Sequence, residues 1–320
     1  MHVLVTGGAG FIGSHLTEAL LDRGDTVTLI DSLDDAYDPA IKARNLAELR
    51  RHASAAPRVI QADLREPGLL LEALEGVDAV AHLAARAGVR QSLVAPQLYA
   101  AANVGGMAAV LDALRQRPGI PLVFASSSSV YGASPRVPFR EDDPADQPLS
   151  PYAATKRAAE LLGHAASAGW GAEVTCLRFF TVYGPRQRPD MAISRFLRRA
   201  LDGVPLPVYG DPGSCRDYTW VGDVVAAIVA ALDRPRPYAV LNVGGGAPVT
   251  LAGLVQAVAE AVGREVAVDS LPPQAGDVPL THADIGRAAE LLGWAPRVGL
   301  AEGLRRTAAW MRRMDGEDPR

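Results

Sequence analysis

Short apolar runs alternate with longer amphipathic segments along the first part of the chain. His2–Thr6 is such a run, which is typical of a strand buried on both faces of a sheet. A glycine-rich turn, Gly7–Gly13, follows it. Ser14–Arg23 then has apolar residues at helical spacing, and Thr26–Ile30 predicts a second strand. The pattern therefore predicts a βαβ unit at the start of the chain.

The alternation continues to Phe179. The further predicted strands are Arg58–Ala62, Ala79–Leu83, Leu122–Ser126 and Glu173–Phe179. The helices predicted between them are Gly68–Glu75, a long one over about Ala95–Arg115, and Ser150–Ala168. Strands separated by helices favour an α/β fold with a doubly wound parallel (Rossmann) sheet.

The rhythm changes after Phe180. A turn-rich segment comes first, and a loop with a short strand is predicted at Leu206–Gly213. We expect a larger domain of residues 1–181 plus about 216–243, and a smaller, discontinuous C-terminal substrate domain of about 182–215 plus 244–320. A cleft between two lobes is a usual place for a ligand. The helices predicted after Phe180 are Ala192–Leu201, Val221–Leu232, Leu251–Val262 and Asp284–Leu292.

Composition narrows the possible classes of protein. The 320 residues carry a net charge of −4, which argues against a general nucleic-acid binder. Cys176 and Cys215 are too few for a disulfide framework or zinc site, and the histidines show no HxxxH spacing, so no metal is expected. No apolar run approaches the ~20 residues that span a bilayer, and no signal peptide is visible. We expect a cytoplasmic protein that binds neither membranes nor nucleic acid.

The glycine-rich turn has the residues of a dinucleotide site. Gly7, Gly10 and Gly13 allow a tight turn and a close approach of the backbone to a pyrophosphate, which the N–H groups at the helix start then face. Asp31 ends the second strand, 21 residues after Gly10, where a carboxylate accepts hydrogen bonds from ribose hydroxyls and repels a 2′-phosphate. The turn and Asp31 together therefore predict NAD rather than NADP. Asp63 is expected at the same sheet edge, near the adenine, or alternatively as a helix N-cap.

Tyr152 and Lys156 are the candidate acid/base pair. Ser150 and Pro151 are N-cap and N1 signals, so the pair lies in the first turns of a helix, on one face. A phenol that acts as a base near neutrality needs about 4 kcal/mol of stabilisation of its charged form. An ammonium alongside and a positive nicotinamide would supply it. YxxxK alone also occurs as an ordinary surface pair, so this prediction depends on the dinucleotide turn.

Four serines, Ser126–Ser129, end the strand that precedes Val130. Doubly wound sheets bind ligands at the carboxyl ends of their strands, so a hydroxyl here can hydrogen-bond the substrate oxygen on which Tyr152 acts. Serines at a strand end are also good turn formers, and this alternative stays open.

Together these residues resemble the extended short-chain dehydrogenases/reductases, and among them the nucleotide-sugar epimerases and dehydratases. The resemblance runs from Val3 to about Trp310. Several stretches are most similar to UDP-glucuronate 4-epimerases. The motifs are TGGAGFIG at Thr6–Gly13, DSLDDAYD at Asp31–Asp38, AGVRQS at Ala87–Ser92, YxxxK at Tyr152–Lys156, RFFT at Arg178–Thr181, VYGP at Val182–Pro185, RQRPDM at Arg186–Met191, RDY at Arg216–Tyr218 and GDVPLTHAD at Gly276–Asp284.

The resemblance implies an isomerase with tightly bound NAD. Tyr152 would take the proton of the sugar 4-hydroxyl while the C4 hydride passes to NAD, and the 4-keto sugar would turn over before the hydride returns to its other face. Lys156 would orient the nicotinamide ribose, with Ser127 and Ser128 assisting at the sugar. The residues implied to contact NAD are Gly7, Gly10, Phe11, Ile12, Gly13, Asp31, Ser32, Asp63, Leu64, Leu83, Ala84, Ala85, Asn103, Tyr152, Lys156 and Phe179.

The resemblance also implies a UDP-sugar substrate. Arg216 matches an arginine that binds the diphosphate, and Asp277 an acid that contacts the nucleotide ribose. Thr181 and Arg188 match positions that meet a sugar carboxylate, which an arginine binds through two parallel hydrogen bonds. Arg188 is equally typical of a solvated residue in an arginine-rich segment. The residues implied to contact the substrate are Arg90, Ser127, Ser128, Ser129, Tyr152, Thr181, Arg188, Val208, Tyr209, Arg216 and Asp277.

Absent groups narrow the implied chemistry. Similar dehydratases carry an Asp-Glu pair before Val-Tyr-Gly, and decarboxylases carry a Glu, whereas Ser128 and Ser129 stand here. The resemblance therefore predicts a 4-epimerase that interconverts UDP-glucuronate and UDP-galacturonate, in a homodimer built on the helices of Tyr99 and Ser150–Ala168. These helices could instead pack within one chain. The alternatives are a 4-epimerase of a neutral UDP- or TDP-hexose, a net reductase and a catalytically silent NAD-binding sensor.

Overall fold

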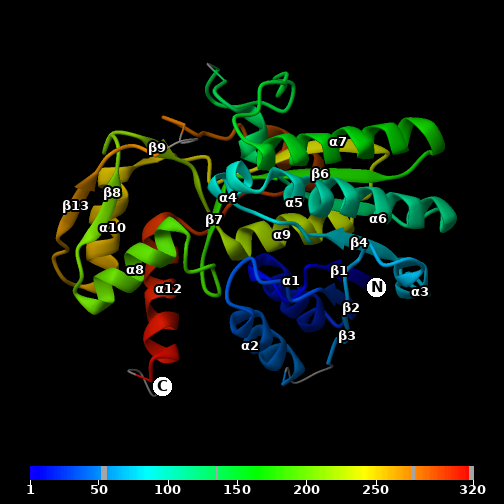
Figure 1. Ribbon diagram of the computed structural model, residues 1–320, viewed down its shortest axis with the longest axis horizontal. Coiled ribbons are helices and arrows are strands. Elements are labelled where there is room, and N and C mark those ends of the chain that lie inside the picture. Colours follow the sequence, from blue (N-terminus) through cyan, green and yellow to red (C-terminus); the bar gives the residue numbers. More distant parts are fainter. Residues whose placement is uncertain (52–55, 135, 275–277, 317–320) are drawn as a thin grey trace.

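A seven-stranded parallel sheet forms the centre of the computed structural model, which describes residues 1–51, 56–134, 136–274 and 278–316 (Figure 1). The strand order is β11-β6-β5-β4-β1-β2-β3, so the chain order reverses between β1 and β4. Doubly wound sheets bind ligands at this switch point. The predicted fold class is confirmed. The strands are β1 (His2–Thr6), β2 (Thr26–Asp31), β3 (Arg58–Gln61), β4 (Ala79–His82), β5 (Leu122–Ser127), β6 (Val174–Phe179) and β11 (Tyr238–Val243).

Successive strand residues face two helical layers, because side chains alternate across a sheet. Val3 and Val5 of β1 pack in one hydrophobic cluster, and Leu4 between them packs in the other. Both faces are thus buried, which explains the near-continuous apolar runs of the strands. The first layer consists of α1 (Phe11–Asp22), α2 (Pro39–Arg50), α9 (Val221–Leu232) and α11 (Gly286–Leu292), and the second of α3 (Leu69–Ala73), α6 (Gly105–Gln116) and α7 (Pro151–Trp170).

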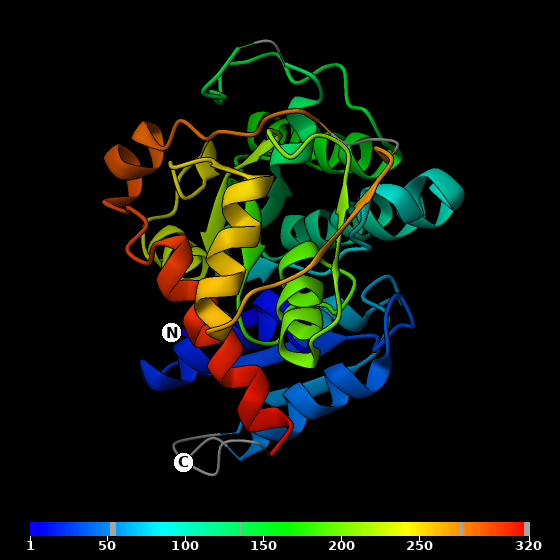
Figure 2. The same ribbon diagram turned by 90° about the vertical axis from the view of Figure 1, so that its left-hand side faces the viewer.

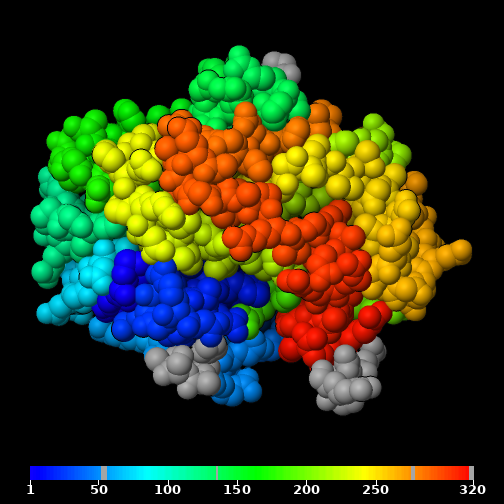
Figure 3. Space-filling view, turned by 180° about the vertical axis from the view of Figure 1, so that it is seen from behind, coloured from blue at the N-terminus to red at the C-terminus, as the bar shows by residue number. Residues whose placement is uncertain are grey.

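A smaller lobe packs at one end of the sheet and has its own hydrophobic cluster (Figures 1 and 2). Its three helices, α8, α10 and α12, pack with the parallel strand pair β8 and β13. Seen from behind, α12 in red lies directly beside α10 in gold (Figure 3). The elements of this lobe are α8 (Ala192–Asp202), β8 (Leu206–Tyr209), α10 (Leu251–Val262), β13 (Val268–Leu271) and α12 (Leu300–Met314).

Short strand pairs join the two lobes. β7 pairs with β10 in parallel, and β9 pairs with β12 in an antiparallel arrangement. The chain therefore passes between the lobes more than once, and residues from both lie next to the sheet edge. These strands are β7 (Thr181–Tyr183), β9 (Cys215–Arg216), β10 (Tyr218–Trp220) and β12 (Val249–Thr250).

The long helix predicted over about Ala95–Arg115 is present as a continuous helical run, with a π-helical segment inside it. A helical turn, α4 (Val89–Val94), comes first, and the backbone leaves the helical region at Ala95. α5 (Pro96–Tyr99) then runs through a π-helical segment, Ala100–Val104, into α6. The π segment directs Asn103 into the interior, where its side chain is buried.

None of the helices in the described residues is both long and apolar enough to cross a membrane. The 20-residue helix α7 has Lys156, Arg157 and Glu160 in its middle, which excludes it on charge alone.

Candidate active site

Glycines shape the turn after β1. Gly7 has φ of +72°, a left-handed conformation that favours glycine, and a Cβ there would lie 2.7 Å from the backbone nitrogen of Ala84. A Cβ on Gly13 would meet the carbonyl oxygen of Gly7, so α1 packs directly against the turn. Gly10 is the N-cap of α1 and provides no side-chain cap. The first N–H groups of this helix therefore remain available to an anion.

This turn borders a cavity of about 460 Å³ at the switch point between β1 and β4, called the larger cavity here to distinguish it from a smaller one beside the serines. Such a volume suits a cofactor or small-molecule ligand. Most of the residues predicted to contact NAD line it. They are Gly7, Gly10, Phe11, Ile12, Gly13, Asp31, Ser32, Asp63, Leu64, Leu83, Ala84 and Ala85.

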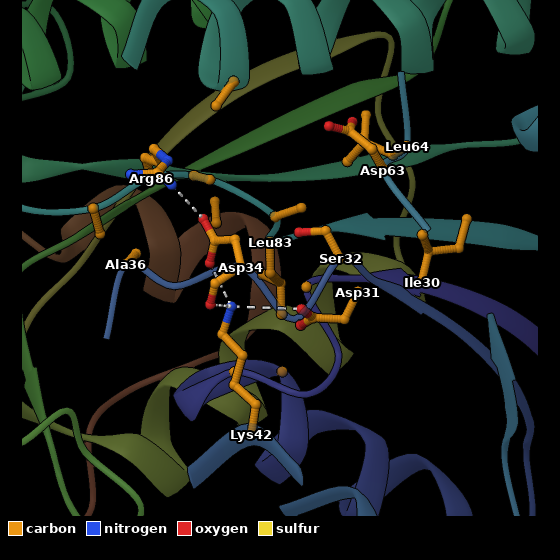
Figure 4. Close-up of a pocket in the computed structure, with 18 of the residues that line it drawn as sticks. Ile30, Asp31, Ser32, Asp34, Ala36, Lys42, Asp63, Leu64, Leu83 and Arg86 are labelled. Atoms are coloured by element: carbon orange, nitrogen blue, oxygen red, sulfur yellow. Dashed lines mark hydrogen bonds and ion pairs between the residues drawn. The ribbon is translucent and has the colours of Figure 1, made fainter. Parts of the chain in front are cut away.

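Asp31 is held firmly at the edge of the larger cavity. Its Oδ2 accepts a hydrogen bond from the backbone N–H of Ala9 at 3.1 Å, and its Oδ1 accepts one from Leu33 at 2.9 Å. The Nζ atom of Lys42 lies 3.6 Å from the same Oδ1, and 2.7 Å from Oδ1 of Asp34 (Figure 4). Sequence reasoning missed Lys42, Asp34, Tyr37 and Arg86 as lining residues. The DSLDDAYD stretch and the presence of only two lysines were the available signals.

The start of α7 holds the Tyr152–Lys156 pair. The hydroxyl of Ser150 caps the helix by accepting a hydrogen bond from the N–H of Ala153 at 3.2 Å. Lys156 is buried, and its Nζ donates to the carbonyl oxygen of Ala125, at the end of β5, at 2.8 Å. Tyr152 is partly buried, and its ring meets that of Tyr99 edge-on at 6.3 Å. The pair thus lies at the carboxyl end of the central strands.

Burial favours the neutral forms of both groups. It lowers the pKa of Lys156 to about 7, and the nearby Glu160 carboxylate partly opposes this change. It raises the pKa of Tyr152, while a hydrogen bond to Ser127 and the positive charge of Arg188 act in the opposite direction. The protein alone therefore does not lower the pKa of the phenol, and that task is left to the positive charge of a bound nicotinamide.

A smaller cavity of about 160 Å³ lies beside the serines. Ser128 and Ser129 line it, together with Thr181 of β7 and Arg216 of β9, all of them predicted substrate contacts. Ser127 is buried, and its Oγ donates to Ser129 Oγ at 3.1 Å while it caps the short 3₁₀ helix Ser128–Tyr131. Strands β7 and β9, which connect the two lobes, thus place Thr181 and Arg216 at the same cavity as Ser128 and Ser129.

Arg188 lines the larger cavity instead, with its side chain only 12% exposed. Its Nη1 donates to the carbonyl oxygen of Ala87 at 2.9 Å, and its Nε and Nη2 form a two-point contact with Asp190 at 3.0 and 2.7 Å. One side of the guanidinium is therefore already occupied by a carboxylate.

The other predicted residues line neither cavity. Asn103 holds the backbone of Arg86 through two hydrogen bonds, and Phe179 and Val208 pack in hydrophobic clusters. Tyr209 lies under the guanidinium of Arg195. Arg90 is exposed on α4, Tyr152 and Lys156 lie outside both linings, and Asp277 falls outside the described residues. Across the described part of the chain, no group of three or more His, Cys, Asp or Glu side chains could hold a metal ion.

Comparison with known proteins identifies the family. Residues 3–244 match the NAD dependent epimerase/dehydratase family. The chain belongs to this family. A curated member, the UDP-glucuronate 4-epimerase of Thermodesulfobacterium geofontis (strain OPF15), is 40% identical over 313 residues, which cover 97% of this chain and 95% of the relative.

Solved structures of family members are similar over nearly the whole chain. The UDP-glucuronic acid 4-epimerase from Bacillus cereus, in complex with UDP-glucuronic acid and NAD, is 34% identical with a TM-score of 0.92, and the similarity covers 98% of this chain and 100% of that one. The UDP-glucose 4-epimerase from Thermotoga maritima, with UDP-glucose, is 31% identical with a TM-score of 0.90, over 98% and 99% of the two chains. The similarity therefore includes the smaller lobe, beyond the residues of the family match.

Proposed function

We propose that the protein is an NAD-dependent isomerase that interconverts UDP-glucuronate and UDP-galacturonate at C4 of the sugar. The observation that carries this proposal is that Tyr152 and Lys156 lie beside the end of β5, where Ser127 interacts with the phenol and the Ala125 carbonyl oxygen accepts from Lys156. The 40% identity to a UDP-glucuronate 4-epimerase supports the choice of substrate.

The larger cavity fits NAD. A Cβ on Gly10 would lie 3.2 Å from the carbonyl oxygen of Gly7, so glycine avoids a close contact at this point of the turn. The uncapped start of α1 suits a pyrophosphate. The rigid carboxylate of Asp31 suits the ribose hydroxyls, with Lys42 beside it. When bound, NAD serves as the acceptor and then the donor of the C4 hydride.

Side chains of the protein then transfer the proton of the sugar hydroxyl. The Tyr152 oxygen takes the proton of the sugar 4-hydroxyl and returns it at the end of the cycle, and Ser127 lies within hydrogen-bonding reach of the phenol. Lys156 is buried one helical turn from Tyr152, and its Nζ is held by the carbonyl oxygen of Ala125. We propose that the smaller domain, about 182–215 plus 244–320, holds the nucleotide, with Arg216 facing the diphosphate from the smaller cavity.

The decisive experiment follows UDP-glucuronate by NMR with the purified protein and no added nicotinamide. Both epimers should form. Tyr152→Phe should keep its circular dichroism spectrum and its bound NAD but lose activity by about 10²–10⁴-fold. The matched control Tyr99→Phe removes a nearby hydroxyl that donates to the Ala87 carbonyl oxygen at 3.2 Å, and should change the rate only a few-fold, roughly the effect of one neutral hydrogen bond. Full activity in Tyr152→Phe, or consumption of NADH in step with product, would contradict the proposal.

A second candidate is the same reaction on a neutral UDP-hexose. One observation favours it: Asp190 already occupies one side of the Arg188 guanidinium, which the glucuronate carboxylate would otherwise use. If Arg188 binds that carboxylate, Arg188→Leu should raise KM for UDP-glucuronate by about 10–100-fold more than it raises KM for UDP-glucose. Equal effects on both substrates, or turnover of UDP-glucose alone by the wild type, would favour the neutral sugar.

We also propose that the protein forms a homodimer. Four large apolar side chains are exposed on neighbouring helices α4, α5 and α7, at 46% for Leu93, 86% for Val94, 53% for Leu98 and 53% for Leu161. Exposed apolar side chains gathered on adjoining elements are typical of interfaces between proteins. A second copy of the chain packed on these helices would bury them.

A further inference from the structure

Four charged side chains form a chain of alternating sign along the larger cavity. Asp31 lies 3.6 Å from Lys42, and Lys42 lies 2.7 Å from Oδ1 of Asp34. The other oxygen of Asp34, Oδ2, lies 3.3 Å from Nη2 of Arg86 (Figure 4). All four residues line the cavity. A single carboxylate, that of Asp34, thus joins a cation from α2 to a cation from the loop after β4.

Both cations are set in fixed positions. Lys42 lies on the buried face of α2 with only 7% of its surface exposed, and an ammonium is buried at this level only when it is paired. The backbone of Arg86 is held on both sides by Asn103, whose Oδ1 accepts from the Arg86 N–H at 2.8 Å and whose Nδ2 donates to the Arg86 carbonyl oxygen at 3.0 Å. The protein thus holds the Lys42 ammonium and the backbone that carries the Arg86 side chain.

The position of Lys42 conflicts with the simple explanation of NAD preference. The carboxylate of Asp31 repels a 2′-phosphate, but an ammonium within 4 Å of that carboxylate attracts the same phosphate with a comparable energy. Lysine and arginine are also the usual partners of a phosphate, and an arginine near this position commonly accommodates the 2′-phosphate of NADP. Asp31 alone therefore does not determine which dinucleotide binds.

We infer that Asp34 is a specificity-determining residue for the cofactor, because its pairing with Lys42 and Arg86 prevents both cations from receiving a 2′-phosphate. This inference rests on the proposed binding of NAD in the larger cavity. With Asp34 ionised, a 2′-phosphate meets two carboxylates and two cations already paired. Without it, Lys42 keeps only its 3.6 Å contact with Asp31 and Arg86 only its contact with the exposed Asp35, so both cations can turn N–H donors toward the phosphate.

The test measures the dissociation constants of NAD and NADP by isothermal titration calorimetry on the full chain freed of nucleotide. Asp34→Asn should bind NADP at least about tenfold more tightly than the wild type and bind NAD within about threefold of it. Asp35→Asn is the matched control: it removes the same charge one residue away, from a side chain that is 89% exposed and lies 3.3 Å from Arg86. It should leave NADP binding within about threefold of the wild type.

A double variant tests whether Lys42 accounts for the added affinity for NADP. Asp34→Asn combined with Lys42→Met should lose most of the added affinity for NADP. The inference is overturned if Asp34→Asn binds NADP as weakly as the wild type, if Asp35→Asn gains as much, or if both Asp34→Asn and Asp34→Ala lose NAD. A wild-type protein that binds neither dinucleotide would instead refute the proposed function.

Discussion

At the scale of single residues, the Tyr152–Lys156 pair differs from the ionic pair that its spacing suggests. Burial raises the pKa of the phenol and lowers that of the amine to about 7, so both groups move toward their neutral forms. The charged form of the phenol then has to be stabilised by what binds beside it. The proposed acid/base function of Tyr152 therefore depends on an occupied cofactor site.

Replacing Lys156 by Met tests the lowered pKa. In the unfolded chain a lysine keeps its proton to about pH 10, whereas folded Lys156 releases it near pH 7. Between these values the unfolded state binds more protons, so this lysine makes the unfolding free energy rise with pH. The difference between wild type and Lys156→Met should shift in favour of wild type above pH 7, by up to about 1.4 kcal/mol per pH unit. Urea denaturation of nucleotide-free protein measures it, and a difference that stays constant from about pH 7 to about pH 9 would contradict a neutral Lys156.

The residues found from sequence are those fixed by local spacing. Gly7, Gly10, Gly13 and Asp31 belong to one βαβ unit, so their spacing alone places them together. Lys42 is one of only two lysines in the chain, but its place at the cavity depends on α2, which the sequence pattern did not predict. Ion pairs between residues of different helices, strands and loops cannot be predicted from such local spacing.

At the scale of the element, the contact between α1 and its turn can be tested by a pair of glycine variants. Gly13→Ala places a Cβ on the carbonyl oxygen of Gly7 and should destabilise the fold by about 2 kcal/mol or more, with loss of NAD binding. Gly169→Ala, near the end of α7, meets nothing within 4 Å and should be neutral or stabilising by up to about 1 kcal/mol. Urea denaturation and NAD titration compare them. Equal stability of the two variants would mean that α1 does not pack tightly on the turn.

The sequence pattern did not predict α2, a helix that buries polar side chains. The buried positions of α2 include Lys42 and Asn45, so its apolar stripe is reduced to Leu46 and Leu49. α12 differs, because Leu304, Ala308 and Met311 form a regular apolar stripe on its buried face, and this helix was missed although its pattern is clear. Parallel strands and α7 were found because their apolar runs and capping signals are local.

At the scale of the whole molecule, the order of the strands separates the proposed cofactor site from the proposed substrate site. The ends of β1 and β2 border the larger cavity, while the serines at the end of β5 and the connecting strand β7 border the smaller one. Tyr152 and Lys156 lie on a helix packed against β5, and Lys156 donates to the carbonyl oxygen of Ala125, which lines the larger cavity. Residues far apart in sequence thus meet only through the crossover topology.

The proposed dimer makes the last prediction. Leu161 lies nine residues after Tyr152 on α7, which places it on the opposite face of the helix from the phenol. Leu161→Glu should therefore weaken self-association by about 100-fold or more without removing a catalytic contact. Val268→Glu, which changes a side chain 44% exposed on β13 of the smaller lobe, is the control and should leave association unchanged. Sedimentation velocity measures both variants. If Leu161→Glu sediments as the wild type does, α7 lies outside any interface, and the exposed side chains of α4 and α5 must be explained in another way.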